Sequence, residues 1–281
     1  MALVEQVTEH WLPLLAALPS ALKVIAFFGI WLVLWLPVAI LLRWRPDKPL
    51  AVEQKLPLLG SLYLIVPLVV WGSAQVEGLS FADYGVRSPN LTSFLVSSGL
   101  GLGLAILGLA VVFGIQWALG WVAWHSENQA RLLPIFLPIL LLGLWISATE
   151  ELVFRGFLQN EFQQDYSAWI AAAIASLIFA ILHLVWEREE TVPQLPGLWL
   201  MGMILTGARW ADGGSLALAW GLHAGWIWGL TCLDSAQLIT YTGKGSHWFT
   251  GLSGKPLAGV AGILCLVGTG VVLWLFFPLN S

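Results

Sequence analysis

The segment TEELVFRG, residues 149–156, brings three ionisable side chains together within two helical turns. Each residue of an α-helix advances by about 100°, so Glu151 and Arg155, four residues apart, lie on one face and can form an ion pair. Glu150 points roughly 140° away from Arg155, so this arginine is less able to neutralise it. The spacing predicts a structural Glu151–Arg155 pair and a Glu150 carboxylate available for chemistry or for a metal ion. A solvated helix end would place the same charges there without any chemistry.

Two histidines in later apolar segments can complete a site with Glu150. His183 ends the run SLIFAILH, and His223 lies within LAWGLHAGWIWGL, where a histidine in the membrane needs a partner from another helix. One carboxylate and two imidazoles can hold and deprotonate a water molecule, and they are also ligands that zinc accepts. The predicted chemistry is hydrolysis, with Glu150, His183 and His223 as catalytic residues or as ligands of a zinc ion. Taken singly, His183 could be an interfacial side chain.

The composition places these residues inside a membrane. The chain of 281 residues is 58% hydrophobic and 10% charged, whereas a soluble domain carries about 25% charged residues. One water-soluble core cannot hide so much apolar surface, so the sequence predicts an integral membrane protein. The formal net charge of −4 and the lack of basic clusters argue against nucleic acid as a partner. Cys232 and Cys265 are too few for a disulfide framework and lack metal-site spacing.

Eight apolar segments are candidates for membrane-spanning helices, which need about 20 residues each. They cover residues 23–42, 57–73, 92–122, 132–156, 168–187, 195–210, 214–231 and 257–278. The sequence predicts an all-α polytopic protein with one transmembrane domain over residues 1–281 and a motif-bearing core at about 132–231. Gly221, Gly225 and Gly229 form a small-residue stripe suited to close helix contact.

The depth of the ionisable residues sets a condition on the fold. Glu150 and His183 can meet only if the fourth helix is long and runs through about residue 162. The segment FRGFLQNEFQQ is helical enough to continue the span and polar enough to line a wet space. We therefore expect a polar, water-filled cavity within the helices rather than a dry bundle.

The basic residues of the loops indicate an orientation. If residues 43–56 are cytoplasmic, alternation of the spans puts eight Lys and Arg residues on that side and four outside or near the other face. The positive-inside rule then favours two non-cytoplasmic termini. Residues 1–20 carry Glu5 and Glu9 but no basic region, so we expect a short interfacial helix there rather than a cleaved signal peptide.

Three motifs in order give a family resemblance. EELVFR at residues 150–155, FAILH ending at His183, and the histidine of GLHAGW at His223 match the EExxxR, FxxxH and third-motif histidine of the CPBP family. The chain resembles these CAAX protease and bacteriocin-processing (Abi) intramembrane proteases, which include the endopeptidase that trims prenylated CAAX proteins. The resemblance implies an eight-helix membrane fold and hydrolysis of a peptide bond in a membrane-anchored or lipidated protein.

The resemblance also implies roles for the residues. Glu150 and His183 would activate the attacking water, and His223 would help to stabilise the oxyanion. Glu151, Arg155 and Phe179 would support the site. The residues fit both a zinc metalloprotease and a metal-independent, glutamate-dependent protease.

The third motif departs from the family pattern. The family commonly has HxxxN or HxxxD there, whereas the fourth residue after His223 is Ile227. The polar partner of the oxyanion site is therefore missing at that position. Two functions stay open: an intramembrane endopeptidase, and a catalytically inactive family member that binds and regulates a membrane partner. A proton-coupled transporter could use the same residues as a relay, but no inverted repeat supports it.

Overall fold

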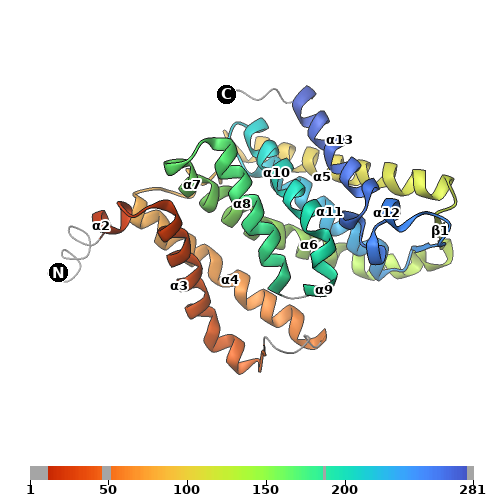
Figure 1. Ribbon diagram of the computed structural model, residues 1–281, viewed down its shortest axis with the longest axis horizontal. Coiled ribbons are helices and arrows are strands. Elements are labelled where there is room, and N and C mark those ends of the chain that lie inside the picture. The colour runs from red at the N-terminus through yellow and green to blue at the C-terminus, as the bar shows by residue number, and fades with distance from the viewer. Residues whose placement is uncertain (1–11, 46–51, 186–187, 277–281) are drawn as a thin grey trace.

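The computed structural model describes residues 12–45, 52–185 and 188–276, and within them the chain is helical apart from one small sheet (Figure 1). The α-helices are α2 (Leu12–Ala16), α3 (Ser20–Leu41), α4 (Val52–Glu77), α5 (Leu91–Ala118), α6 (Leu132–Glu151), α7 (Gln159–Asp165), α8 (Ala168–Leu182), α9 (Arg188–Thr191), α10 (Leu195–Ala211), α11 (Ala217–Ser235), α12 (His247–Thr250) and α13 (Val260–Phe276). The other elements are the π-helix η3 (Leu152–Leu158), the strands β1 (Val122–Trp124) and β2 (Ile239–Tyr241), and the 3₁₀ segments η2 (Ser126–Arg131), η4 (His183–Val185), η5 (Val192–Gln194), η6 (Leu252–Gly254) and η7 (Pro256–Ala258). The N-terminal interfacial helix predicted over residues 1–20 falls partly on residues 1–11, which lie outside the described part.

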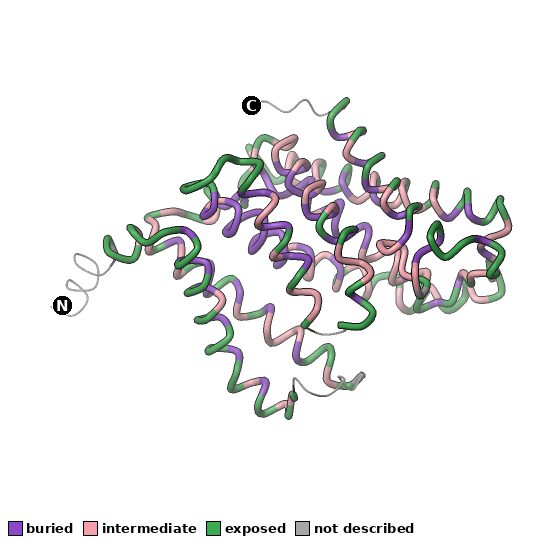
Figure 2. Tube along the Cα trace, viewed as in Figure 1, coloured by how far each residue is buried: buried purple, intermediate pink, exposed green. Residues whose placement is uncertain are grey.

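The helices have the length and surface of membrane spans. In the described residues, five helical stretches are long and apolar enough to cross a membrane: Ser20–Leu41, Glu53–Glu77, Leu91–Ala118, Ser126–Asp165 and Ala168–Val185. Helix α13 is a shorter apolar helix. Large apolar side chains such as Val33, Leu64 and Trp274 are about two-thirds exposed, and buried positions concentrate in the central helices (Figure 2). Such surfaces need lipid as their solvent. The all-α polytopic membrane fold is confirmed, and the number of eight spans stays a prediction.

The third predicted span is shorter than expected. Helix α5 ends at Ala118, and Gly120, with a φ of 69°, turns the chain into β1. Glycine adopts this left-handed conformation without the steric cost of a side chain. β1 pairs antiparallel with β2, with Val122 opposite Tyr241. Two short strands of three residues leave no hydropathy signal of their own, so the sequence did not predict them.

The glycine stripe of α11 packs against α5, as predicted. A Cβ atom at Gly221 would overlap the carbonyl oxygen of Ser98, and one at Gly225 would lie 2.6 Å from the Cβ of Ala105. Only glycine permits this approach of two helix backbones. The contact fixes α11 and, with it, the position of His223.

The fourth helix is as long as the site requires. α6, η3 and α7 continue one another as far as Asp165, so the helix runs beyond residue 162 as predicted. A short turn at Tyr166 and Ser167 then reverses the chain into α8. Glu150 precedes Tyr166 by sixteen residues, and His183 follows Ser167 by sixteen residues. Because the two arms are equally long, the hairpin brings both residues to a similar depth.

Long-range contacts sort the loops into two ends of the molecule. At one end, the β1–β2 pair joins the loops after α5 and α11, and Lys255 lies 2.6 Å from Glu190 of α9. At the other end, Arg87 donates to the carbonyl oxygen of Gly213 at 3.0 Å, which joins the loops after α4 and α10. This division matches the alternation of spans predicted from the sequence.

Candidate active site

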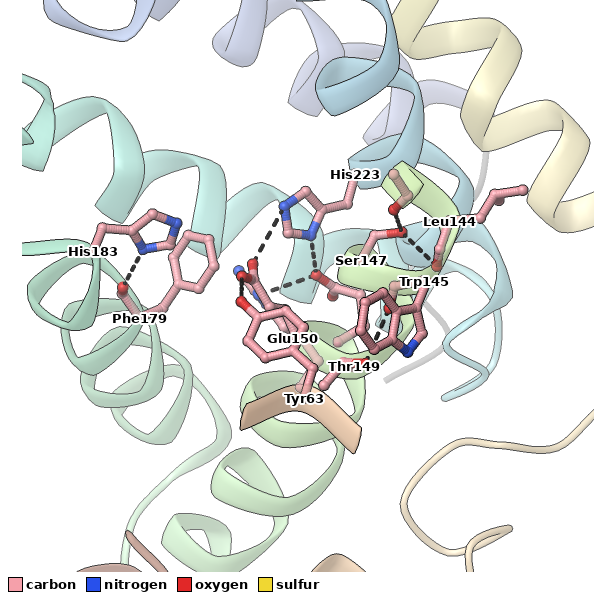
Figure 3. A network of polar contacts seen from close by, with 12 residues as sticks. Tyr63, Leu144, Trp145, Ser147, Thr149, Glu150, Phe179, His183 and His223 are labelled. Atoms are coloured by element: carbon pink, nitrogen blue, oxygen red, sulfur yellow. Dashed lines mark hydrogen bonds and ion pairs between the residues drawn. The ribbon is translucent and has the colours of Figure 1, made fainter. Parts of the chain in front are cut away.

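Glu150 lies near the end of α6 and is 8% exposed. The hydroxyl of Tyr63, from the middle of α4, donates a hydrogen bond to its Oε1 atom, and Nε2 of His223 lies 3.6 Å from its Oε2 atom (Figure 3). Arg155 pairs with Glu151 and not with Glu150, as predicted. The partners of Glu150 come from α4 and α11 instead. Tyr63 is not among the predicted site residues; its only signal in the sequence is a hydroxyl in the middle of the apolar run SLYLIVP, where it must find an acceptor.

Glu151 is fully buried and joins two basic side chains. Its Oε1 atom accepts from Nη1 of Arg155 at 3.1 Å and lies 2.8 Å from Nδ1 of His223. The predicted ion pair with Arg155 is present, and His223 has the partner from another helix that its membrane setting demands. Because an ionised carboxylate only accepts hydrogen bonds, Nδ1 of His223 carries the proton.

Phe179 contacts the side chain of Arg155, and Arg209 contacts its backbone. The Arg155 guanidinium carbon lies 4.4 Å from the centroid of the Phe179 ring, a cation–π contact. Phe179 is itself fully buried and meets the ring of His183 edge-on at 4.6 Å. Arg209, from the last turn of α10, donates from Nη1 to the backbone carbonyl oxygen of Arg155. Arg209 is not among the predicted site residues, and its signal in the sequence is a basic residue inside a predicted span.

The π-helix explains why Arg209 is needed. A π-turn bonds each N–H to the carbonyl five residues back, so a change from α to π geometry displaces the regular acceptors. A cationic side chain inserted from a neighbouring helix satisfies one of the affected carbonyls. Gly156 lets the preceding loop approach the same turn, since a Cβ there would lie 2.9 Å from the carbonyl oxygen of Tyr84.

His183 follows the last residue of α8 and is positioned by its own helix. Its Nδ1 atom lies 2.8 Å from the carbonyl oxygen of Phe179 (Figure 3). A carbonyl oxygen can only accept, so Nδ1 carries the proton and Nε2 of the neutral ring keeps its lone pair. The tautomer is therefore suited to accept a hydrogen bond from a water molecule.

Glu150, Tyr63 and His183 line one cavity of about 340 Å³. The other lining residues are largely apolar and aromatic side chains of α3 and α4 and of the ends of α6 and α8: Phe28, Trp31, Leu32, Trp35, Leu62, Val153, Phe154, Leu182 and Val185, together with Trp44 and Thr149. His223 does not line this cavity; it is 2% exposed and lies behind Glu150. The structure thus brings Glu150 and His183 to one cavity and makes His223 a neighbour of both glutamates.

The predicted zinc ligands do not form a metal cluster as they are placed. Within the described ranges, no group of three or more His, Cys, Asp or Glu side chains is arranged to hold a metal ion. Both ring nitrogens of His223 already face glutamates, and Nδ1 of His183 faces a backbone carbonyl. Zinc dependence therefore stays a prediction.

Ile227 occupies the place of the family's third-motif polar residue and packs against α6. Its Cγ2 atom would lie 3.4 Å from a Cβ atom at Gly143. The side chain fills the contact between α11 and α6 one turn beyond His223. It supplies no hydrogen-bond donor to the site.

These observations define a class: a polytopic membrane protein with a buried carboxylate and an imidazole facing one cavity. Residues 132–229 match the family of Rce1-like proteins, the type II CAAX prenyl endopeptidase Rce1-like family. The chain is similar to that family over this segment, and the resemblance to the CPBP intramembrane proteases is confirmed. The segment contains the glutamates and both site histidines, whereas Tyr63 lies outside it. Comparisons with curated proteins and with solved structures found no match.

Proposed function

We propose that the protein is an intramembrane endopeptidase of the CAAX type, which hydrolyses a peptide bond in a membrane-associated or lipidated protein. The observation that carries this proposal is the single cavity shared by Glu150 and His183, which come from the two arms of one helical hairpin. The match to the Rce1-like family supports protease activity at the level of the family.

In the proposed mechanism, a water molecule sits between Glu150 and Nε2 of His183. Glu150 takes a proton from this water as general base, and the water oxygen forms a bond to the carbonyl carbon of the substrate. The C–N bond then breaks as Glu150 passes the proton to the leaving amine. Tyr63 holds one oxygen of the Glu150 carboxylate, so that the base keeps its orientation while the proton moves.

His223 has a positioning role in this mechanism. Glu151 holds its Nδ1 atom, and its Nε2 atom faces Glu150 at 3.6 Å, which is too long for a hydrogen bond but close enough to limit the movement of the carboxylate. Since Ile227 offers no donor, the hydroxyl of Tyr63 is the donor on the cavity wall nearest to Glu150. We propose that Tyr63 and His223 together orient the Glu150 carboxylate.

The apolar composition of the cavity wall favours an apolar substrate. Phe28, Trp31 and Trp35 of α3 line the same cavity as Glu150 and His183. Aromatic walls of this kind bury an apolar peptide segment or a lipid chain.

The test is cleavage of a membrane-anchored, lipidated peptide by the purified protein reconstituted in liposomes. Glu150→Gln keeps the shape of the side chain but removes the base, and we expect a rate at least about 100-fold lower. Glu190→Gln, an exposed carboxylate, is the matched control and keeps the parent rate. Equal rates for the parent and Glu150→Gln would falsify the assignment.

A catalytically inactive family member that binds and regulates a membrane partner is the second candidate, and Ile227 favours it. It predicts that the parent cleaves nothing while Ile227→Asn gains activity. Binding of a membrane protein by the parent without cleavage would support the same reading.

Metal dependence is tested by metal removal. The mechanism above predicts an unchanged rate after treatment with a strong zinc chelator and dialysis, because the water is activated by Glu150 and His183. The measurement is the cleavage rate together with the zinc content of the purified protein. A rate that falls on chelation and returns with added Zn²⁺ would establish the zinc enzyme instead.

A further inference from the structure

A second buried polar cluster lies at the far end of the same hairpin. Lys23, near the start of α3, places its Nζ atom 2.7 Å from Oε1 of Glu77 and 3.6 Å from Oε2 of Glu161. The same nitrogen donates to Gln164 at 2.8 Å. Figure 1 shows that the start of α3 and α7 lie close together here, next to the end of α4. The cluster is eleven residues beyond Glu150 on the continuous helix and belongs to a different cavity.

The cluster forms the polar end of an apolar cavity of about 400 Å³ between α3 and α4. Lys23, Glu77 and Glu161 line it together with apolar residues: Leu15, Leu18, Ala26, Phe27, Ile30, Leu34, Leu68, Val69, Trp71, Gly72, Val76 and Phe157, with Ser73 among them. An amphipathic cavity of this kind fits a ligand with one polar end and one apolar end.

The polar end lacks one donor. Glu161 is fully buried, and its Oε1 atom has no hydrogen-bond partner. Lys23 brings one positive charge to two carboxylates, Glu77 and Glu161. A buried carboxylate oxygen without a donor is costly, so a cationic donor from a ligand would complete the cluster. A headgroup that carries only negative charge would meet two carboxylates and be repelled.

The apolar wall of the cavity is about as long as one lipid leaflet is thick. Lys23 lies near the start of α3 and Glu77 is the last residue of α4, and the ends of spanning helices are where lipid headgroups are expected. From Lys23 to Leu34 the apolar wall runs eleven residues along α3, or roughly 17 Å at about 1.5 Å per residue. This is about half of the roughly 30 Å hydrocarbon core of a bilayer.

We propose that this cavity binds a membrane lipid whose head carries a primary ammonium group. One acyl chain lies along the apolar wall, and the ammonium donates a hydrogen bond to Oε1 of Glu161. A trimethylammonium head has no N–H to donate, and it cannot replace the primary amine. The ligand is held at the opposite end of the hairpin from Glu150, and the proposal does not depend on the proposed function.

The test compares lipids that differ only in the head. The purified full chain is delipidated in detergent, and phosphatidylethanolamine, phosphatidylcholine or phosphatidylglycerol with identical acyl chains is added. Bound lipid is counted by native mass spectrometry, and the unfolding temperature is measured in parallel. We expect phosphatidylethanolamine to be retained about tenfold better than phosphatidylcholine, as the loss of one charged hydrogen bond predicts.

Two variants test separately how the lipid headgroup and the acyl chain contribute to binding. Glu161→Gln should abolish the preference for phosphatidylethanolamine over phosphatidylcholine. Gly72→Leu should lower the retention of both lipids, because a side chain at Gly72 meets open space and extends into the cavity. Gly29→Leu is the matched control: it lies on α3, its Cβ also meets nothing within 4 Å, and it does not line the cavity.

Three results would overturn the proposal. The first is equal retention of the three lipids by the parent protein. The second is unchanged retention by Gly72→Leu at the same unfolding temperature. The third is a dimer whose cross-links pass through a cysteine placed at residue 72, which would show that a second copy of the chain covers the cavity.

Discussion

At the scale of single residues, the site is a chain of neighbours that fix one another. Arg155 holds Glu151, Glu151 holds Nδ1 of His223, and His223 faces Glu150. Both Arg155 and Glu151 are excluded from solvent. Removing either charge would therefore leave the other buried without its partner, which is strongly destabilising. The two adjacent glutamates therefore have different tasks: Glu151 anchors the basic side chains, and Glu150 meets the cavity.

Tyr63 gives the first prediction at this scale. Tyr63→Phe removes the hydroxyl that holds Glu150, and we expect kcat to fall by about 10- to 100-fold, the equivalent of one hydrogen bond to a charged group. KM should change much less, because the aromatic ring still lines the cavity. Initial rates over a range of substrate concentrations in liposomes separate the two constants.

Tyr166→Phe is the control for this substitution. Tyr166 is 45% exposed and lies in the turn at the other end of the hairpin. It should leave both constants unchanged. A Tyr63→Phe variant that changes only KM would mean that the hydroxyl contacts substrate rather than positioning the base.

The spacing of residues predicted some of these contacts and could not predict others. Glu151 and Arg155 are four residues apart on one helix, so their pairing follows from helix geometry alone. Tyr63 is 87 residues from Glu150 in the sequence, and nothing local indicates that α4 passes there. The same holds for Arg209, which reaches the backbone of Arg155 from another helix.

At the scale of elements, close helix approach decides where the histidines lie. α11 can bring His223 to Glu151 only because its glycines let it rest on α5. The apolar segments and the glycine stripe were readable from the sequence, since both depend on residue type and period. The π geometry of η3 and the β1–β2 pair were not, because they arise from tertiary contacts that no local pattern records.

Gly221 gives the prediction at this scale. Gly221→Ala drives a methyl group into the backbone of α5 at Ser98, so the helices must separate. We expect a loss of about 1–3 kcal/mol of stability, as for other overpacked contacts, and a loss of activity with it. Gly207→Ala on α10 is the control, because a Cβ there meets nothing within 4 Å. Unfolding in detergent measures both variants, and equal stabilities would contradict the packing described above.

At the scale of the whole molecule, the two ends differ in composition and contacts. One end carries the β1–β2 pair and the Glu190–Lys255 ion pair, and the other carries the turn at Tyr166 and the Arg87–Gly213 hydrogen bond. The cavity lined by Glu150 and the cavity lined by Glu161 lie toward opposite ends of the α3–α4 hairpin. The positive-inside rule assigns the end with the β1–β2 pair to the cytoplasm.

This orientation is tested by labelling single cysteines in intact cells with a membrane-impermeant maleimide, in a background that lacks Cys232 and Cys265. Ser80→Cys, in the loop after α4, should react in intact cells. Ser126→Cys, in the loop that contains β1, should react only after the membrane is permeabilised. Both serines are exposed, so the reverse pattern would invert the topology.

The number of residues in the π-helix η3 sets the orientation of Glu150 relative to Glu161 on the long helix. Removing one residue from an α-helix turns everything beyond it by about 100° and shortens it by about 1.5 Å. Glu150 precedes η3 and Glu161 follows it, so a single-residue deletion within Leu152–Leu158 would rotate one cavity relative to the other. Substitutions there alter side chains one at a time, whereas a change in residue count would alter the position of Glu150 relative to Glu161 and would disturb both cavities at once.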